Sequence, residues 1–147
     1  NGEGVNKDLV LAAYWYRKSA EQGNSDAQFK IGCMYDHGDG VKKNYFEAVK
    51  WYIKAAEQGD SYAQFNIGLM YEDGIGVRQD YGKAVKWYIK AAEQGDSDGL
   101  AKLGEMFEYG TGVRQDSAEA VKWYKKAAEQ GDSVAQKRLE ERWWQCR

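Results

Sequence analysis

Few residues in this chain carry side chains that act as nucleophiles, general bases or metal ligands at neutral pH. The sequence contains one histidine, His37, and two cysteines, Cys33 and Cys146. A catalytic triad or a zinc site needs several such groups close together. A lone histidine in a loop is more typical of the surface, and Cys33, next to Gly32, is more typical of a small packing residue. We therefore expect no catalytic residue, no metal site and no enzymatic activity.

Glycine pairs at a fixed spacing raise the question of phosphate binding. Each pair is followed by valine, at Gly2-x-Gly4-Val5, Gly38-x-Gly40-Val41, Gly74-x-Gly76-Val77 and Gly110-x-Gly112-Val113. A dinucleotide-binding loop needs G-x-G-x-x-G after a strand, and a P-loop needs G-K-[ST]. Neither pattern occurs in the sequence, and no strand is expected. The glycine pairs therefore predict loops, and no cofactor is expected.

The charge of the chain argues against several classes of partner. Its 147 residues include 21 basic and 23 acidic side chains, for a net charge of −2. Proteins that bind nucleic acid or anionic membranes carry a basic excess, so neither partner is expected. No apolar stretch is long enough to span a bilayer, which predicts a soluble chain without membrane insertion. Because the sequence begins at Asn1 without methionine, we expect upstream sequence, and a removed signal peptide with a bacterial periplasmic or secreted location would fit.

Tryptophan marks an internal repeat. Trp15, Trp51, Trp87 and Trp123 are each separated by 36 residues, in segments such as AVKWYIKAAEQG. A fixed period in this range is typical of a supersecondary unit that is stacked into a solenoid. Because the Trp-Tyr pairs recur at one place in every copy, we expect them in the core rather than as stacking platforms for single-stranded nucleic acid.

Residues 60–95 illustrate the unit, which we expect to be a first helix, a loop, a second helix and a tight turn. Ser61 is the expected N-cap of the first helix, with Gln64 completing a capping box. Gly68, inside that helix, costs about 1 kcal/mol against alanine, so it predicts close approach by a neighbouring helix. Asp80 is expected to cap the second helix. Its equivalents in the other units are Asp8, Asn44 and Asp116.

The period also divides the chain. It predicts a half repeat at 1–23, repeats at 24–59, 60–95 and 96–131, and a C-terminal capping helix at 132–147. In that last helix Glu140 replaces the recurrent glycine, as expected of a polar cap that closes the stack. We predict a single domain, 1–147, that is all-α and forms a right-handed α/α superhelical solenoid.

The repeated motifs resemble a known family. The succession A-Q-F-x-I-G-x-M-Y, G-x-G-V and A-V-K-W-Y-x-K-A-A-E-Q-G is similar to the Sel-one-like repeat (SLR) family of tetratricopeptide-like solenoids. The resemblance implies a non-catalytic adaptor or scaffold that binds proteins or peptides, as in membrane-protein quality control, bacterial envelope assemblies and host contact. A cysteine-rich branch has a disulfide in every repeat and reported penicillin binding. This chain lacks those cysteines, so that property is not carried over.

In tetratricopeptide-like stacks the first helices line the concave face, and positions that differ between copies are free to select a partner. Aligning the first helices of this chain with those of tetratricopeptide-like stacks places an aromatic patch beside acidic side chains. Such a surface would suit a peptide with a hydrophobic anchor and basic residues. The other interpretation assigns the aromatic rings to the core between repeats and the acids to a solvated rim. The predicted partner-binding residues are Asp26, Phe29, Cys33, Asp36, Tyr62, Phe65, Leu69, Glu72, Asp73, Asp98, Glu105, Glu108 and Tyr109, with Val134, Lys137, Glu141 and Trp144 in the terminal helix.

Three alternatives stay open at this point. The same surface could belong to an inhibitory or immunity-type binder of an enzyme or toxin. The chain could be a hydrolase of the kind suggested for the cysteine-rich relatives, with His37 as the residue to test. The natural binding face could also lie in repeats outside this sequence.

Overall fold

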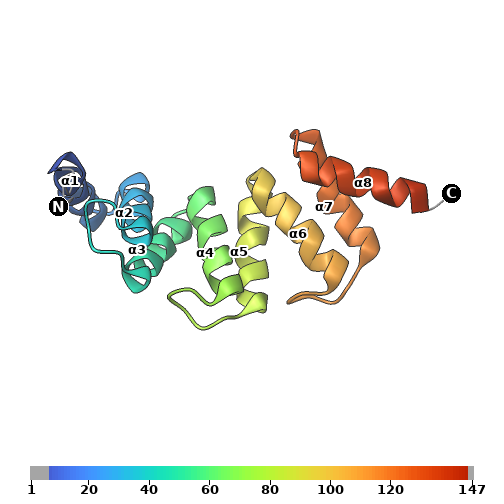
Figure 1. Ribbon diagram of the computed structural model, residues 1–147, viewed down its shortest axis with the longest axis horizontal. Coiled ribbons are helices and arrows are strands. Elements are labelled where there is room, and N and C mark those ends of the chain that lie inside the picture. The colour runs from blue at the N-terminus through green and yellow to red at the C-terminus, as the bar shows by residue number, and fades with distance from the viewer. Residues whose placement is uncertain (1–6, 146–147) are drawn as a thin grey trace, which may run out of the picture. The chain divides into compact units, whose positions relative to one another are not determined.

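The computed structural model describes residues 7–145, and the side chains of residues 7–142. Within this range the chain forms helices and no strand, which confirms the all-α class (Figure 1). The first glycine pair (Gly2 to Val5), Cys146 and the side chain of Trp144 lie outside the described parts. The helices are α1 (Lys7–Glu21), α2 (Ser25–His37), α3 (Tyr45–Glu57), α4 (Ser61–Asp73), α5 (Tyr81–Glu93), α6 (Ser97–Tyr109), α7 (Ser117–Glu129) and α8 (Ser133–Gln145).

The chain divides into two compact units, Asn1–Gln79 with α1 to α4 and Asp80–Arg147 with α5 to α8. In the first unit α1 packs on α2, α2 on α3 and α3 on α4; in the second, α5 packs on α6, α6 on α7 and α7 on α8. First-type helices (α2, α4, α6, α8) and second-type helices (α1, α3, α5, α7) therefore alternate with the expected period. The single-domain boundary 1–147 stays a prediction.

The N-caps of the first-type helices lie one residue earlier than predicted. Asp60, with extended backbone, accepts a hydrogen bond from the Ala63 amide at 2.7 Å, so Ser61 is the first helical residue and not the cap. The capping box is also wrong: the Gln64 side chain is buried and donates to the carbonyl of Ala56 at 3.0 Å. Gln64 therefore ties its helix to the preceding second-type helix. Asn24 and Asp96 are the equivalent caps.

The caps of the second-type helices were predicted correctly for three helices out of four. Asn44, Asp80 and Asp116 accept hydrogen bonds from amides in the first turns of α3, α5 and α7. Asp8 differs, because α1 already begins at Lys7 and Asp8 lies inside its first turn. The acidic side chain is still placed favourably there, near the positive end of the helix dipole.

The corrected caps give a prediction about stability. Asp60→Ala removes the acceptor of the Ala63 amide and is expected to cost about 1 kcal/mol of unfolding free energy. Ser61→Ala, one residue on, should change it by less than about 0.5 kcal/mol, since it removes no cap. Urea unfolding followed by circular dichroism measures both variants. An equal or larger loss for Ser61→Ala would contradict the assignment of the cap.

Glycine inside the first-type helices allows the close approach of a neighbouring helix that the sequence predicted, and the approaching group is a tyrosine ring. A Cβ atom on Gly32 would lie 2.8 Å from the Tyr52 ring, and one on Gly104 would overlap the Tyr124 ring. Both tyrosines are fully buried, with exposed fractions of 1% and 0%. The rings can lie this deep only because the facing residue has no side chain.

In the three G-x-G-V loops that the structure describes, the second glycine has a packing role of its own. Gly76 has a φ of 68°, and a Cβ there would lie 2.6 Å from the carbonyl oxygen of Tyr45, the first residue of α3. Gly112 makes the same approach to Tyr81 at the start of α5, and Gly40 approaches Leu9 in α1. These three loops therefore rest on the preceding second-type helix, which explains the second glycine of each described pair.

The tryptophan ladder is less uniform than the sequence predicted. Trp51 is buried, with 6% of its surface exposed, but Trp15 is 61% exposed, which corrects its assignment to the core. Trp87 and Trp123 are half-buried, and the ammonium groups of Lys90 and Lys126 lie 4.2 and 4.7 Å from their ring centres. Such cation–π contacts shield the rings from water. Within the described residues, none of the helices combines the length and the apolar composition that a bilayer span requires.

Candidate functional site

Nine of the predicted partner-binding residues lie on α2 and α4 of the first unit, two first-type helices separated by α3. These nine residues are half-buried or exposed. Asp26, Tyr62 and Asp73 are exposed; the half-buried residues are Phe29, Cys33, Asp36, Phe65, Leu69 and Glu72. We call the surface of α2 and α4 that these nine residues mark the α2–α4 face.

The aromatic residues of the α2–α4 face are in contact. The ring centre of Phe29 lies 5.8 Å from that of Tyr52 and 6.0 Å from that of Tyr62. Tyr52 belongs to the core, whereas Tyr62 is 66% exposed. Phe29 thus lies between a buried ring and an exposed one. One side of Phe29 packs in the core, as one interpretation predicted, and the other side faces the surface, as the partner-binding interpretation predicted. Tyr62 is the aromatic side chain that a partner can reach.

An acidic pocket opens on the same face. It has a volume of about 170 Å³ and brings together the predicted residues Asp36, Leu69 and Asp73. Asp36 accepts a hydrogen bond from the hydroxyl of Tyr52 at 3.4 Å, which orients its carboxylate. The other lining residues are Asn66, Met70 and Ile75.

The acidic pocket at Asp36 and Asp73 combines an apolar wall with two carboxylates. This combination suits a lysine or arginine side chain, whose alkyl stem packs on apolar groups while its charged end meets the acids. Asn66 was not predicted. The signal was present, because the equivalent positions carry Lys30 and Lys102, so the copies disagree there.

In the second unit, basic side chains lie beside two of the predicted acids. Lys102 Nζ lies 3.6 Å from a carboxylate oxygen of Glu105, and Arg142 Nε lies 4.0 Å from one of Glu108. Glu108 also accepts a hydrogen bond from the Tyr124 hydroxyl at 2.7 Å.

The remaining predicted residues of α6 are exposed, and one of them also has a basic neighbour. Tyr109 lies under the guanidinium of Arg138, 5.9 Å from the ring centre, and Asp98 is open to solvent. Basic neighbours reduce the attraction that this helix exerts on a cationic partner.

The two residues considered for catalysis take part in local structure. Burial raises the pKa of the Cys33 thiol, so the thiol stays protonated at neutral pH and is a weak nucleophile. The Nδ1 atom of His37 lies 2.9 Å from the backbone carbonyl oxygen of Cys33, within the last turn of α2. The pair therefore lies within a single helical turn rather than across a cleft.

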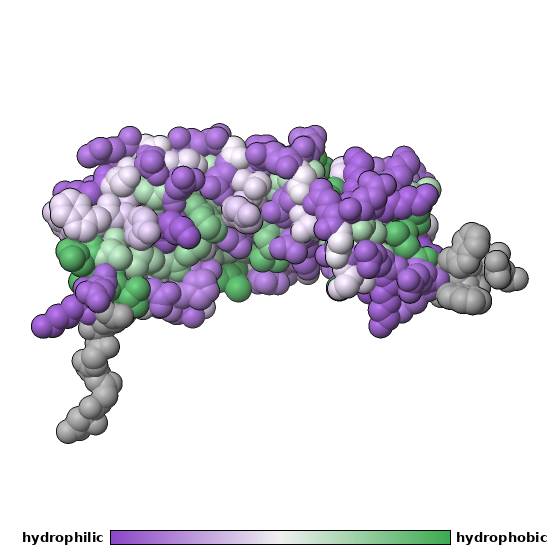
Figure 2. All heavy atoms as spheres, turned by 90° about the horizontal axis from the view of Figure 1, so that it is seen from above, coloured by the Kyte–Doolittle hydropathy of each residue, from purple (hydrophilic) through white to green (hydrophobic). Residues whose placement is uncertain are grey.

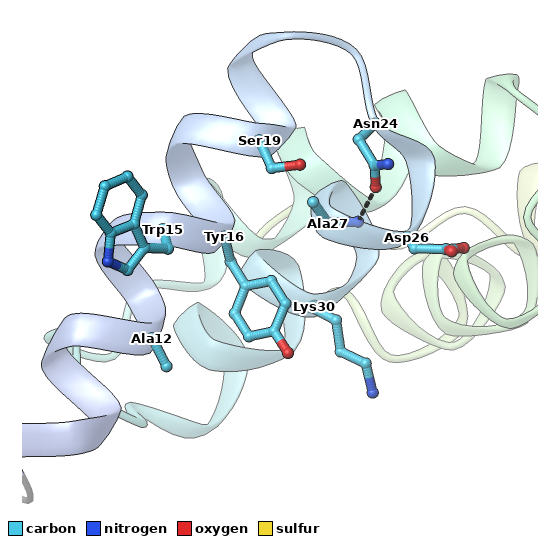
Figure 3. Close-up of a pocket in the computed structure, with 8 residues that line it drawn as sticks. All are labelled: Ala12, Trp15, Tyr16, Ser19, Asn24, Asp26, Ala27 and Lys30. Atoms are coloured by element: carbon cyan, nitrogen blue, oxygen red, sulfur yellow. Dashed lines mark hydrogen bonds between the residues drawn. The ribbon is translucent and has the colours of Figure 1, made fainter.

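A second concavity in the first unit was not predicted. It lies along α1 and α2, has a volume of about 590 Å³, and is lined mainly by apolar atoms. Trp15 and Tyr16 line it from α1, and Asp26 and Lys30 from α2 (Figure 3). We call it the α1–α2 groove. In the structure, the exposed side chain of Trp15 marks this groove. The sequence analysis predicted Trp15 in the core and therefore did not predict the groove.

Comparison with known proteins agrees with this architecture. The model of the Sel1 repeat matches residues 1–24, 25–60, 61–96 and 97–132, within one residue of the repeat boundaries predicted above. No curated protein sequence matches the chain significantly. Sel1 repeat proteins are generally scaffolds for protein interactions and are typically not enzymes.

Solved structures show the same fold. A protective antigen with an SLR fold, from uropathogenic Escherichia coli, is 44% identical with a TM-score of 0.88 over 90% of this chain and 28% of that chain. A Sel1 repeat protein from Oxalobacter formigenes is 45% identical with a TM-score of 0.83, covering 86% of this chain and 52% of that one. Cysteine-rich protein B of Helicobacter pylori is 29% identical with a TM-score of 0.71, covering 92% and 97%. The chain thus spans about a quarter to a half of the length of the first two relatives.

Proposed function

Because the chain belongs to the Sel1 repeat family, we propose that it is a non-catalytic interaction module that binds a protein or peptide on its α2–α4 face. The partner segment is extended or helical and carries a hydrophobic anchor beside a lysine or arginine. This face corresponds to the concave face of tetratricopeptide-like stacks. The observation that carries the proposal is the pocket at Asp36 and Asp73, on the same two helices as the contact between Phe29 and Tyr62.

The two parts of the face make different contributions to binding. The exposed ring of Tyr62 offers apolar area that a hydrophobic anchor would cover, and buried aromatic contacts often dominate interface energies. The carboxylates of Asp36 and Asp73 attract a basic segment before contact and fix its register. Both effects need the partner to present an apolar and a basic group about two helical turns apart, roughly 10 Å, which sets its specificity.

A peptide-display selection tests this proposal with a defined probe. A random library of short peptides, selected on the purified protein, is expected to enrich sequences that combine aromatic or aliphatic residues with Lys or Arg. Tyr62→Ala and Asp73→Asn should each weaken the best peptide about tenfold, the effect of losing about 1.4 kcal/mol. Isothermal titration calorimetry measures the affinities.

Phe46→Ala provides the matched control, because Phe46 is a 73% exposed aromatic on the second-type helix α3. Its removal should leave peptide affinity unchanged. If the Tyr62→Ala and Asp73→Asn variants bind the peptide as tightly as the unmodified protein does, the α2–α4 face is not the binding site. A hydrolytic activity that disappears in His37→Ala would contradict the non-catalytic assignment.

A further inference from the structure

The acidic pocket at Asp36 and Asp73 has a counterpart in the second unit, two repeat periods later in the sequence. Glu108 corresponds to Asp36. In each unit a buried tyrosine donates its hydroxyl group to this acid, Tyr52 at 3.4 Å and Tyr124 at 2.7 Å. The acid is therefore held in the same way in both units, and the groups in front of it can be compared residue by residue.

In the second unit the chain places its own arginine in front of the acid. The Nε atom of Arg142 lies 4.0 Å from a carboxylate oxygen of Glu108, and the two side chains are mostly buried, with exposed fractions of 27% and 17%. Another nitrogen of this guanidinium group, Nη1, donates to the backbone carbonyl of Ser117 at 3.0 Å. Arg138, one turn earlier in α8, lies over Tyr109. Where the chain supplies a side chain to this site, that side chain is an arginine.

The first unit has neutral side chains at both arginine positions. Asn66 corresponds to Arg138, and Met70 corresponds to Arg142. Both neutral residues line the pocket of about 170 Å³, and Met70 is 5% exposed. Of the described residues that line this pocket, two carry carboxylates and none is basic. A guanidinium group at this site of the first unit would therefore have to come from another molecule.

The backbone carbonyl that Arg142 uses is covered in the first unit by the loop that follows α4. The equivalent carbonyl belongs to Tyr45, and a Cβ atom on Gly76 would lie 2.6 Å from its oxygen. Asp73 lines the pocket beside Asp36 and offers a carboxylate instead. A guanidinium group in this pocket would therefore meet two carboxylates rather than one carboxylate and a carbonyl.

This lining suits arginine better than lysine. A guanidinium group presents five N–H donors in a planar fork, so it can bind two carboxylates at once, and it is more weakly hydrated than an ammonium group. Its alkyl stem would pack on Leu69, Met70 and Ile75, which line the same pocket. Figure 2 shows the same mixture on a larger scale, with hydrophobic side chains between polar ones over the first unit. The pocket is smaller than the roughly 300–1,000 Å³ of small-molecule sites, which suits a single side chain.

We propose that the basic residue of the partner is an arginine, whose guanidinium group binds between Asp36 and Asp73 while its stem packs on Met70. This rests on the proposed function, because it names the residue that the α2–α4 face selects. It also predicts how the chain could block its own site. Asn66→Arg gives the first unit the arginine that the second unit has at Arg138, and this side chain would compete with the partner.

Matched peptides separate the contributions of charge and shape. A library with arginine as its only basic residue, selected on the purified protein, is expected to supply a peptide that Tyr62→Ala and Asp73→Asn weaken. Replacing its arginine with lysine keeps the charge but removes the planar fork, and should lower the affinity about tenfold. Replacing it with citrulline keeps the shape but removes the charge, and should lower the affinity at least as much. Isothermal titration calorimetry measures each affinity.

Variants at position 66 test the competition within the protein. Asn66→Arg should weaken the arginine peptide about tenfold, whereas Asn66→Gln should change its affinity less than about twofold. Circular dichroism verifies that both variants keep their fold. Equal affinities for Asn66→Arg and the unmodified protein would contradict the placement of the guanidinium group in this pocket.

The possible outcomes distinguish this proposal from the function on which it rests. If the lysine peptide binds as tightly as the arginine peptide, charge alone is sufficient and the arginine assignment is wrong, while the α2–α4 face is still the binding site. If the citrulline peptide binds as tightly, the contact with the two carboxylates is wrong. If no selected peptide depends on Tyr62 and Asp73, the α2–α4 face is not the binding site, and the arginine assignment fails with it.

Discussion

Replacing Tyr52 with alanine is expected to lower the free energy of unfolding by about 3–5 kcal/mol, the range for large buried aromatic side chains. The Tyr52 ring is 1% exposed and packs against the bare backbone of Gly32. No neighbouring side chain at Gly32 can fill the space, so the cavity persists and the cost stays at the upper end for such changes. Guanidinium chloride unfolding followed by circular dichroism measures the loss.

Two further variants separate the causes of this effect. Tyr16→Ala changes the same repeat position one period earlier, where the ring is 40% exposed, and should cost less than about 1 kcal/mol. Tyr52→Phe keeps the ring and removes the hydrogen bond to Asp36, which at 3.4 Å should contribute about 1 kcal/mol or less. If Tyr16→Ala costs as much as Tyr52→Ala, burial by the covering helix is not the source of the stability.

The helices were predictable because equivalent helices of each unit pack in the same way, so the same residues recur at the same positions. Gly32 and Tyr52 are the clearest case: a glycine that is unfavourable in a helix indicated a close neighbour, and the structure places a ring there. The N-caps of the first-type helices were missed for a local reason. Asp60 and Ser61 are both good capping residues, and only the backbone conformation decides which of them stands outside the helix.

The site was less predictable because the exposure and the ion pairs of its residues depend on side chains from other helices. Trp15 has the same sequence context as Trp51, and it is exposed because its burial depends on a covering helix. Glu108 was predicted to bind a partner, but its carboxylate lies near Arg142, which comes from α8. Such pairs join side chains of different helices, so the sequence of a single repeat does not reveal them. The copies do show where they differ, as at Asn66, but not which basic group faces which acid.

Gly104→Ala is expected to lower the free energy of unfolding by up to about 2 kcal/mol, although alanine is the better helix former. Two effects oppose each other at this position. Helix propensity favours alanine by about 1 kcal/mol, whereas overpacking a well-filled core costs about 1–3 kcal/mol. The new Cβ atom would overlap the ring of Tyr124, which is fully buried and cannot turn away. The steric cost therefore exceeds the gain.

Gly82→Ala is the matched control, because Gly82 also lies in a helix but the nearest atom to its Cβ position is 3.4 Å away. There only propensity acts, and a gain of up to about 1 kcal/mol is expected. The decisive test is Gly104→Ala in a Tyr124→Ala background. With the ring gone the clash is gone, so the same substitution should become neutral or stabilising. A penalty that persists without the ring would mean that Gly104 is required for some other reason, and the pairing of glycine with tyrosine would no longer explain the repeat.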